Sequence, residues 1–92
     1  MKTVYYETVF DGDPLMCVTS KDYWDRNHFV DDGDGPDYMA ISEAMETCGA
    51  VEDSTSVFQI PETDEAAIVS GMATHGFELV KSPDFTAFLG RT

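Results

Sequence analysis

An internal repeat is the feature that most constrains how this chain can fold. The segment from Asp37 to Gly49 recurs 27 residues later as the segment from Asp64 to Gly76. Two copies are too few for a solenoid, in which at least three repeats stack on one another. We therefore expect the two copies to share one core. The matching positions are Asp37 and Asp64, Ala40 and Ala67, Ile41 and Ile68, Met45 and Met72, Thr47 and Thr74, and Gly49 and Gly76.

Each copy predicts an amphipathic helix. Its apolar residues recur at i, i+3, i+4 and i+7, the spacing of one buried helix face. We expect Asp37 to cap the first helix, and Thr63 or Asp64 to cap the second. Gly49 and Gly76 stand where a left-handed residue commonly ends a helix. The predicted buried stripes are Ile41, Ala44, Met45 and Cys48 in the first copy, and Ile68, Gly71, Met72 and His75 in the second.

The rest of the sequence favours β-structure. Residues 3–19 predict a β-hairpin around the turn residues 11–14, Asp-Gly-Asp-Pro. Each repeat helix is followed by a β-prone stretch with an internal turn. We therefore predict a small α+β domain: a mainly antiparallel sheet with two amphipathic helices on one face, built from an N-terminal hairpin and a duplicated helix–Gly–hairpin unit. A plain αβαβ order, with one strand after each helix, is the alternative.

The 92 residues are enough for a single domain over 1–92. Its expected parts are the hairpin 3–19, an irregular acidic loop 20–37, and repeat copies over 37–60 and 64–89. The first residues do not resemble a secretory signal, and the longest aliphatic run, Ala66–Val69, is far too short to cross a membrane. We therefore expect a cytoplasmic protein with Cys17 and Cys48 reduced.

The charge balance excludes several functions. The chain has 18 acidic residues against 5 Lys and Arg, a formal net charge of −13. Binding nucleic acid directly, or docking on an anionic membrane, needs the basic residues that are missing. No Lys or Arg occurs from Asn27 to Val80, although twelve carboxylates fall in that span. Such unpaired charges repel one another, and sequences that break local rules without compensation often do so at functional sites.

We expect no metal, cofactor or catalytic centre. Asp32, Asp34 and Glu43 match positions 1, 3 and 12 of an EF-hand loop, but Pro36 and Asp37 then occupy positions 5 and 6, where a ligand and a glycine are needed. The two cysteines and two histidines lack the close pairing of zinc ligands. Neither cysteine has a visible activating partner, so the sequence predicts a protein that is not an enzyme.

In charge and length the chain resembles the DNA-mimic inhibitors of phages and mobile elements, such as anti-CRISPR and anti-restriction proteins. This resemblance implies a partner that is a basic nucleic-acid-binding protein and, if a phage encodes the chain, a location in the cytoplasm of the host cell. The alternative is a small interaction or adaptor module that binds through an aromatic loop or a sheet edge. A general acidity typical of salt-loving hosts would also explain the charge. The expected partner-binding residues are Asp31, Asp32, Asp34, Glu43, Glu46 and Trp24.

Overall fold

The computed structural model describes residues 1–11, 13–27, 33, 37–60 and 64–81. These residues form a five-stranded sheet and three helices, so the predicted α+β class is confirmed. In chain order the elements are β1 (Lys2–Asp11), β2 (Asp13–Ser20), α1 (Lys21–Asn27), α2 (Tyr38–Thr47), β3 (Val51–Ser54), β4 (Val57–Gln59), α3 (Glu65–Thr74) and β5 (Phe77–Lys81).

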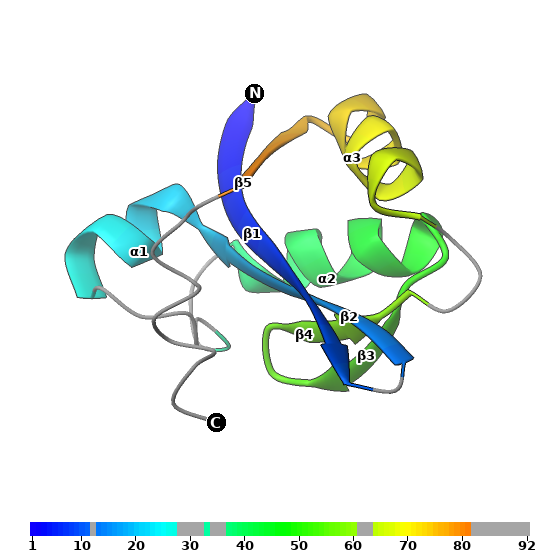
Figure 1. Cartoon of the computed structure of the whole chain (residues 1–92). Coiled ribbons are helices and arrows are strands. Elements are labelled where there is room, and N and C mark those ends of the chain that lie inside the picture. Colours follow the sequence, from blue (N-terminus) through cyan, green and yellow to red (C-terminus); the bar gives the residue numbers. More distant parts are fainter. Residues whose placement is uncertain (12, 28–32, 34–36, 61–63, 82–92) are drawn as a thin grey trace.

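The sheet has the strand order β3-β4-β2-β1-β5 (Figure 1). The predicted N-terminal hairpin is confirmed: β1 and β2 pair antiparallel, and their register extends to the pair Asp11 and Asp13, two of the four residues expected in the turn. β4 pairs antiparallel with β2 and with β3. Only β5 runs parallel to its neighbour, β1, because α3 carries the chain across one face of the sheet before β5 begins. The sheet is therefore mainly antiparallel, as predicted.

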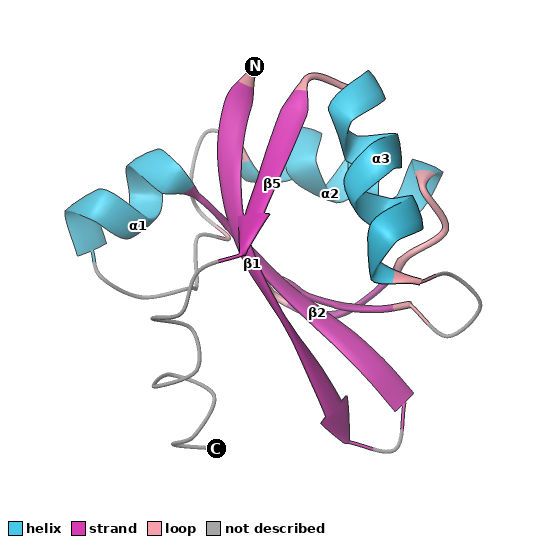
Figure 2. Ribbon diagram, turned by 45° about the horizontal axis from the view of Figure 1, so that its top comes forward, coloured by secondary structure: helices cyan, strands magenta, loops and turns pink. Residues whose placement is uncertain are grey.

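The core lies between the sheet and the two repeat helices, α2 and α3, which cover the same face (Figure 2). The equivalent repeat residues Ile41 and Ile68 are both buried, and so are Met45 and Met72. α2, Gly49 and the β3–β4 hairpin follow the order predicted for the first copy. The second copy begins in the same way with α3, Gly76 and β5, but residues 82–89 of its predicted hairpin lie outside the described residues. The strands contribute Val4, Met16, Val18 and Phe58, each 0% exposed.

Helix α1 was not predicted. The sequence favoured an irregular acidic loop over residues 20–37, whereas residues 21–27 are helical. Side-chain interactions explain the difference. The Ser20 Oγ accepts a hydrogen bond from the backbone N–H of Tyr23 at 3.1 Å, as at a helix start. Ion pairs at i, i+4 spacing join Lys21 to Asp25 and Asp22 to Arg26, and such pairs stabilise a helix.

The ends of the repeat helices agree with the sequence in part. Gly49 and Gly76 have φ angles of 99° and 88°, the left-handed conformation expected after each helix. Asp64 caps α3, since its carboxylate accepts a hydrogen bond from the backbone N–H of Ala67 at 2.8 Å. Asp37 occupies the N-cap position of α2 but makes no side-chain cap hydrogen bond. Its carboxylate pairs with the ammonium of Lys2 instead, so the prediction that it caps the helix with its side chain was wrong.

The opposite face of the sheet carries a second, smaller cluster. Cys17 alternates along β2 with the core residues and therefore points away from α2 and α3. Tyr5, Trp24 and Val57 pack against Cys17 there, and all three are half-buried. Helix α1 thus brings Trp24 to the side of the sheet opposite the main core.

Candidate functional site

The described cations are all held in ion pairs. Lys2 pairs with Asp37, and on α1 Lys21 pairs with Asp25 while Arg26 pairs with Asp22. At the end of β5, the Lys81 Nζ lies 3.5 Å from Glu7 and 3.4 Å from Glu65. No Lys or Arg in the described part of the chain is therefore available to neutralise a further carboxylate.

Four exposed carboxylates remain on α2 and β3, and we call them the α2–β3 ridge: Glu43, Glu46, Glu52 and Asp53. Two of them are held by neutral donors. The Tyr38 hydroxyl donates to Glu52, and the Gln59 Nε2 donates to Asp53 at 3.2 Å. Within the described residues, Glu43 and Glu46 have neither a cation nor a hydrogen-bond donor as partner. Because they are three residues apart on one helix, they are neighbours on its surface and repel each other.

Tyr38 connects the two elements that carry these carboxylates. Its ring is buried at the first turn of α2, and its hydroxyl also accepts a hydrogen bond from the backbone N–H of Ser56 at 3.0 Å. Ser56 lies in the β3–β4 turn with a φ of 65°. One buried side chain therefore joins the helix that carries Glu43 and Glu46 to the hairpin that carries Glu52 and Asp53.

A different carboxylate cluster is part of the framework. The Tyr6 hydroxyl donates to Glu65 Oε2 at 2.8 Å, and the Thr8 hydroxyl lies 3.3 Å from Glu65 Oε1. Burial, together with the charge of Glu65, raises the pKa of Tyr6 to about 12. The hydrogen bond from Tyr6 in turn lowers the pKa of Glu65. These contacts attach the first turn of α3 to β1.

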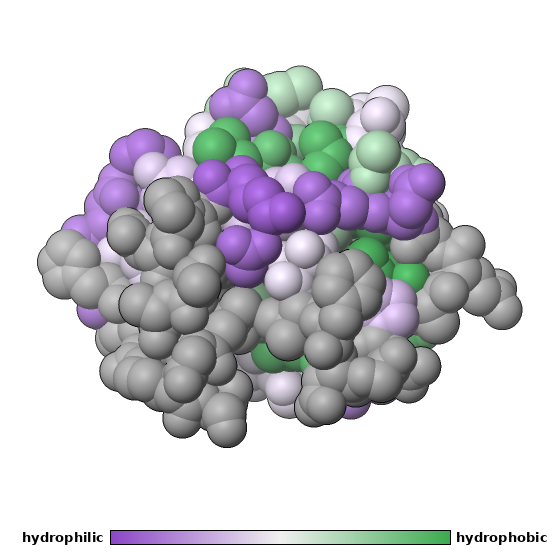
Figure 3. All heavy atoms as spheres, in the orientation of Figure 1, coloured by the Kyte–Doolittle hydropathy of each residue, from purple (hydrophilic) through white to green (hydrophobic). Residues whose placement is uncertain are grey.

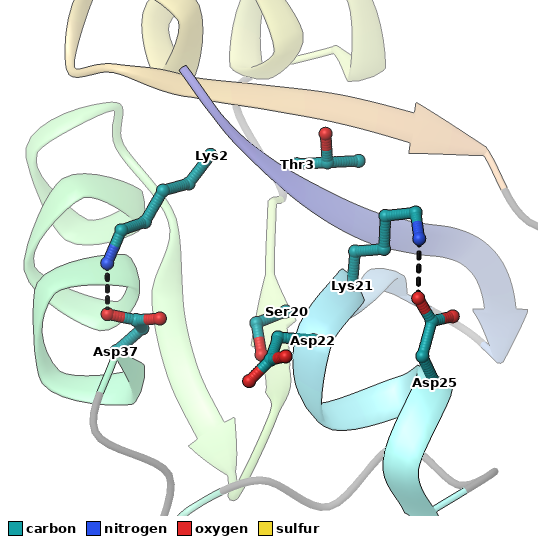
Figure 4. A pocket seen from close by; sticks show the side chains of 7 residues that line it. All are labelled: Lys2, Thr3, Ser20, Lys21, Asp22, Asp25 and Asp37. Carbon is teal, nitrogen blue, oxygen red and sulfur yellow. Dashed lines mark hydrogen bonds and ion pairs between the residues drawn. The ribbon is translucent and has the colours of Figure 1, made fainter.

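A cavity of about 440 Å³ lies between β1, α1 and the start of α2 (Figure 4). Its charged groups are already satisfied: Lys2 reaches Asp37 on one side, and Lys21 reaches Asp25 on the other. Asp22, which also lines the cavity, pairs with Arg26. The cavity therefore offers no free charge to a ligand. The lining residues are Lys2, Thr3, Ser20, Lys21, Asp22, Asp25 and Asp37.

A second hollow, of about 310 Å³, lies between α2 and the junction of α3 with β5. We call it the α2–β5 groove. The sequence did not predict this groove, because the groove forms only where α2, the first repeat helix, packs beside the residues that follow α3, the second repeat helix. His75, expected to pack in the core or at its edge like its counterpart Cys48, is exposed, whereas Cys48 is half-buried. The groove is lined by Ala40, Glu43, Ala44, Thr47, His75 and Phe77.

The structure brings together some of the predicted binding residues and separates others. Glu43 and Glu46 are exposed side by side on α2, as expected from the helical spacing. Trp24 is half-buried on the opposite side of the sheet, so it does not belong to the same surface. The remaining predicted residues, Asp31, Asp32 and Asp34, lie outside the described residues.

In residues 1–11, 13–27, 33, 37–60 and 64–81, no group of three or more His, Cys, Asp or Glu is placed to hold a metal ion. Burial, with a contribution from Glu7, raises the pKa of Cys17 to about 11, and burial also raises that of Cys48. Burial thus disfavours the thiolate form of both cysteines.

Hydrophilic residues form a band across the described part of the face in Figure 3, with hydrophobic residues above it. No helix in the described part of the chain is long and apolar enough to cross a membrane.

Comparisons of the chain with known protein families, curated proteins and solved structures gave no match.

Proposed function

We propose that this protein is an acidic inhibitor that occupies the basic nucleic-acid-binding site of a partner protein, in the manner of phage anti-CRISPR or anti-restriction proteins. One observation carries the proposal. The described Lys and Arg side chains are all bound by carboxylates outside the α2–β3 ridge, and none of them belongs to the described residues 37–60, where the four exposed ridge carboxylates lie.

Charge density favours a partner that binds nucleic acid. Duplex DNA carries one negative charge per ~1.7 Å of its axis. Glu43 and Glu46 are separated by about 4.5 Å along the helix axis, from the rise of an α-helix. Two carboxylates on one helix are therefore sparser than phosphates, and an effective mimic must combine α2 with the hairpin. Tyr38 holds these two elements in a fixed relation, which reduces the ordering cost of binding.

The alternative is an interaction module that binds through Trp24. Trp24 is half-buried beside Tyr5 and Val57, and tryptophan is enriched among the residues that dominate binding energy. This surface lies across the sheet from α2, so a Trp24 variant leaves Glu43 and Glu46 in place. The two functions are therefore separable by experiment.

The test uses purified basic proteins of known activity: a restriction endonuclease, a CRISPR effector, a repressor, and a basic protein that does not bind nucleic acid. Each is titrated with the full chain at about 50 mM and about 200 mM salt, with and without duplex DNA as competitor. The proposal predicts that at least one nucleic-acid-binding protein is bound and inhibited, that affinity falls steeply with salt, and that DNA competes. An affinity that changes neither with salt nor with competitor DNA contradicts the proposal.

The matched control is Glu78→Gln. Glu78 is also exposed and has no partner among the described residues, but it lies on β5, away from the ridge. The Glu78→Gln substitution removes one negative charge and leaves the proposed contact surface unchanged. A variant with Glu43→Gln and Glu46→Gln should weaken binding more than twice as much as Glu78→Gln does. Equal losses per charge would indicate a general field effect and no defined surface.

A further inference from the structure

We infer that the α2–β5 groove receives an arginine side chain of the basic partner. This inference rests on the proposed function and specifies its contact chemistry. The groove, at about 310 Å³, is at the lower limit of the ~300–1,000 Å³ typical of small-molecule sites. Its size suits one long side chain better than a nucleotide or a larger ligand.

The lining of the groove matches the two ends of an arginine. Ala40, Ala44 and Phe77 supply apolar surface, against which the three methylene groups of an arginine stem pack. Glu43 stands at the same groove with a carboxylate that has no partner among the described residues. A guanidinium group binds such a carboxylate through two parallel N–H···O bonds.

Glu43 is the lining residue that can pair with a guanidinium group. The Thr47 hydroxyl donates to the backbone carbonyl of Glu43 at 2.9 Å and is therefore engaged within α2. A neighbouring cation is also engaged: Lys2, which faces Phe77 in the β1–β5 ladder, pairs with Asp37. Glu43 is thus left for a cation from outside the described chain.

Arginine fits better than lysine because two aromatic residues line the groove. These are the exposed His75 and the buried Phe77. A planar, weakly hydrated guanidinium stacks on such rings, whereas a strongly hydrated ammonium loses more on entering an apolar hollow. The geometry therefore favours an arginine whose stem lies along α2 and whose head lies between Glu43 and His75.

The inference is tested by titrating the full chain with N-acetyl-arginine amide and following backbone and methyl NMR signals. We expect saturable shifts at Ala40, Ala44 and Thr47, with a Kd in the millimolar range for one partly exposed ion pair. N-acetyl-citrulline amide, which has the same shape without the charge, should give no such shifts. Shifts of equal size with both probes, or shifts confined to another surface, overturn the inference.

Two variants and a control separate the contributions. Glu43→Gln should weaken arginine binding about fivefold or more. Ala40→Leu fills the groove without changing any charge and should weaken it similarly, while Glu78→Gln should leave it unchanged. Binding unaffected by both groove variants overturns the inference. The arginine titration contains no nucleic-acid-binding protein. If the protein does not bind the arginine probe, the proposal for the ridge therefore still stands. If it binds the probe but inhibits no basic protein, the arginine site stands and the proposed function fails.

Discussion

The Sγ of Cys48, at the end of α2, lies 2.6 Å from the position that a Cβ on Gly71 of α3 would occupy. The first repeat copy has Ala44 where the second has Gly71, so the two copies differ at the point where the helices meet. A glycine here removes the one atom that would collide with the sulfur. The close approach of α2 to α3 therefore depends on this pair.

Replacing Gly71 with alanine should destabilise the protein. The new Cβ would meet both the Sγ and the Cβ of Cys48, which has one rotatable side-chain bond with which to respond. Overpacking costs about 1–3 kcal/mol, and the better helix propensity of alanine returns up to about 1 kcal/mol. We expect a net loss of about 1 kcal/mol in the free energy of unfolding, measured by urea denaturation.

Two controls accompany this variant. Ser70→Ala changes helix propensity at an exposed neighbouring position without the collision, so it should be neutral or slightly stabilising. Cys48→Ala combined with Gly71→Ala should recover part of the loss, because the collision is absent. A Gly71→Ala protein more stable than the wild type would show that the helices separate at no cost.

Much of this architecture could be predicted from the sequence. The β1–β2 hairpin, both repeat helices and the two left-handed glycines depend on local patterns, and all are present. The parallel pairing of β1 with β5 could not be predicted, because alternation along a strand does not specify its partner. Helix α1 was missed because seven residues are too few to show a helical period, and its stability comes from side-chain pairs such as Asp22 with Arg26.

The candidate site was predictable to a smaller degree. The exposure of Glu43 and Glu46 follows from helical spacing. The repeat suggested that Cys48 and His75 have equivalent surroundings, but Cys48 is half-buried against Gly71 of α3, whereas His75 is exposed. Asp37 has a strong local capping signal, yet its carboxylate pairs with Lys2, 35 positions away in sequence. Contacts of this range depend on how the elements pack, which local patterns do not encode.

The two cap residues should respond differently to truncation. Asp64→Ala removes a cap hydrogen bond from α3 and should cost about 1 kcal/mol in the free energy of unfolding. Asp37→Ala removes only an exposed ion pair with Lys2 and should cost about half as much or less. Urea denaturation of both single variants measures the difference. A larger loss for Asp37→Ala than for Asp64→Ala would contradict the cap assignment.

Stability should depend on pH through Tyr6 and Glu65. The Tyr6 pKa is raised from 10.0 to about 12, so its contribution is complete below pH 10 and is lost as the pH rises toward 12. The Glu65 pKa is lowered from 4.5, so its contribution is present above pH 4.5 and is lost as the pH falls below that value. Denaturation curves across the pH range should therefore show stability falling at both ends.

Tyr6→Phe tests this assignment. The variant loses one hydrogen bond, so we expect about 1 kcal/mol less stability at neutral pH. Its loss of stability between pH 10 and about 12 should be shallower than that of the wild type. Some alkaline loss should remain: burial lowers the pKa of Lys81, but Glu65 and Glu7 raise it by more. An unchanged alkaline slope in Tyr6→Phe would contradict the role given to its hydroxyl.

Salt should stabilise the protein. The net charge is −13, and no described cation is free to neutralise the carboxylates of the ridge. Raising monovalent salt from about 10 mM to about 150 mM shortens the Debye length from about 30 Å to about 8 Å and weakens their repulsion. We expect the melting temperature, followed by circular dichroism, to rise over this range. A flat or falling melting temperature would mean that the carboxylates are dispersed or paired.

The central claim is that the α2–β3 ridge, together with the sequence-predicted residues Asp31, Asp32 and Asp34, forms the binding surface, and association kinetics test it most directly. The five-fold variant replaces Asp31, Asp32 and Asp34 with Asn and Glu43 and Glu46 with Gln, and it is compared with the wild type, Glu78→Gln and Trp24→Ala. Stopped-flow measurements with an inhibited basic partner give the association rate at low and high salt. The five-fold variant should associate more slowly and with a flatter salt dependence, while Glu78→Gln and Trp24→Ala should stay near the wild type. An unchanged rate and salt dependence in the five-fold variant, with binding abolished by Trp24→Ala, would contradict the account.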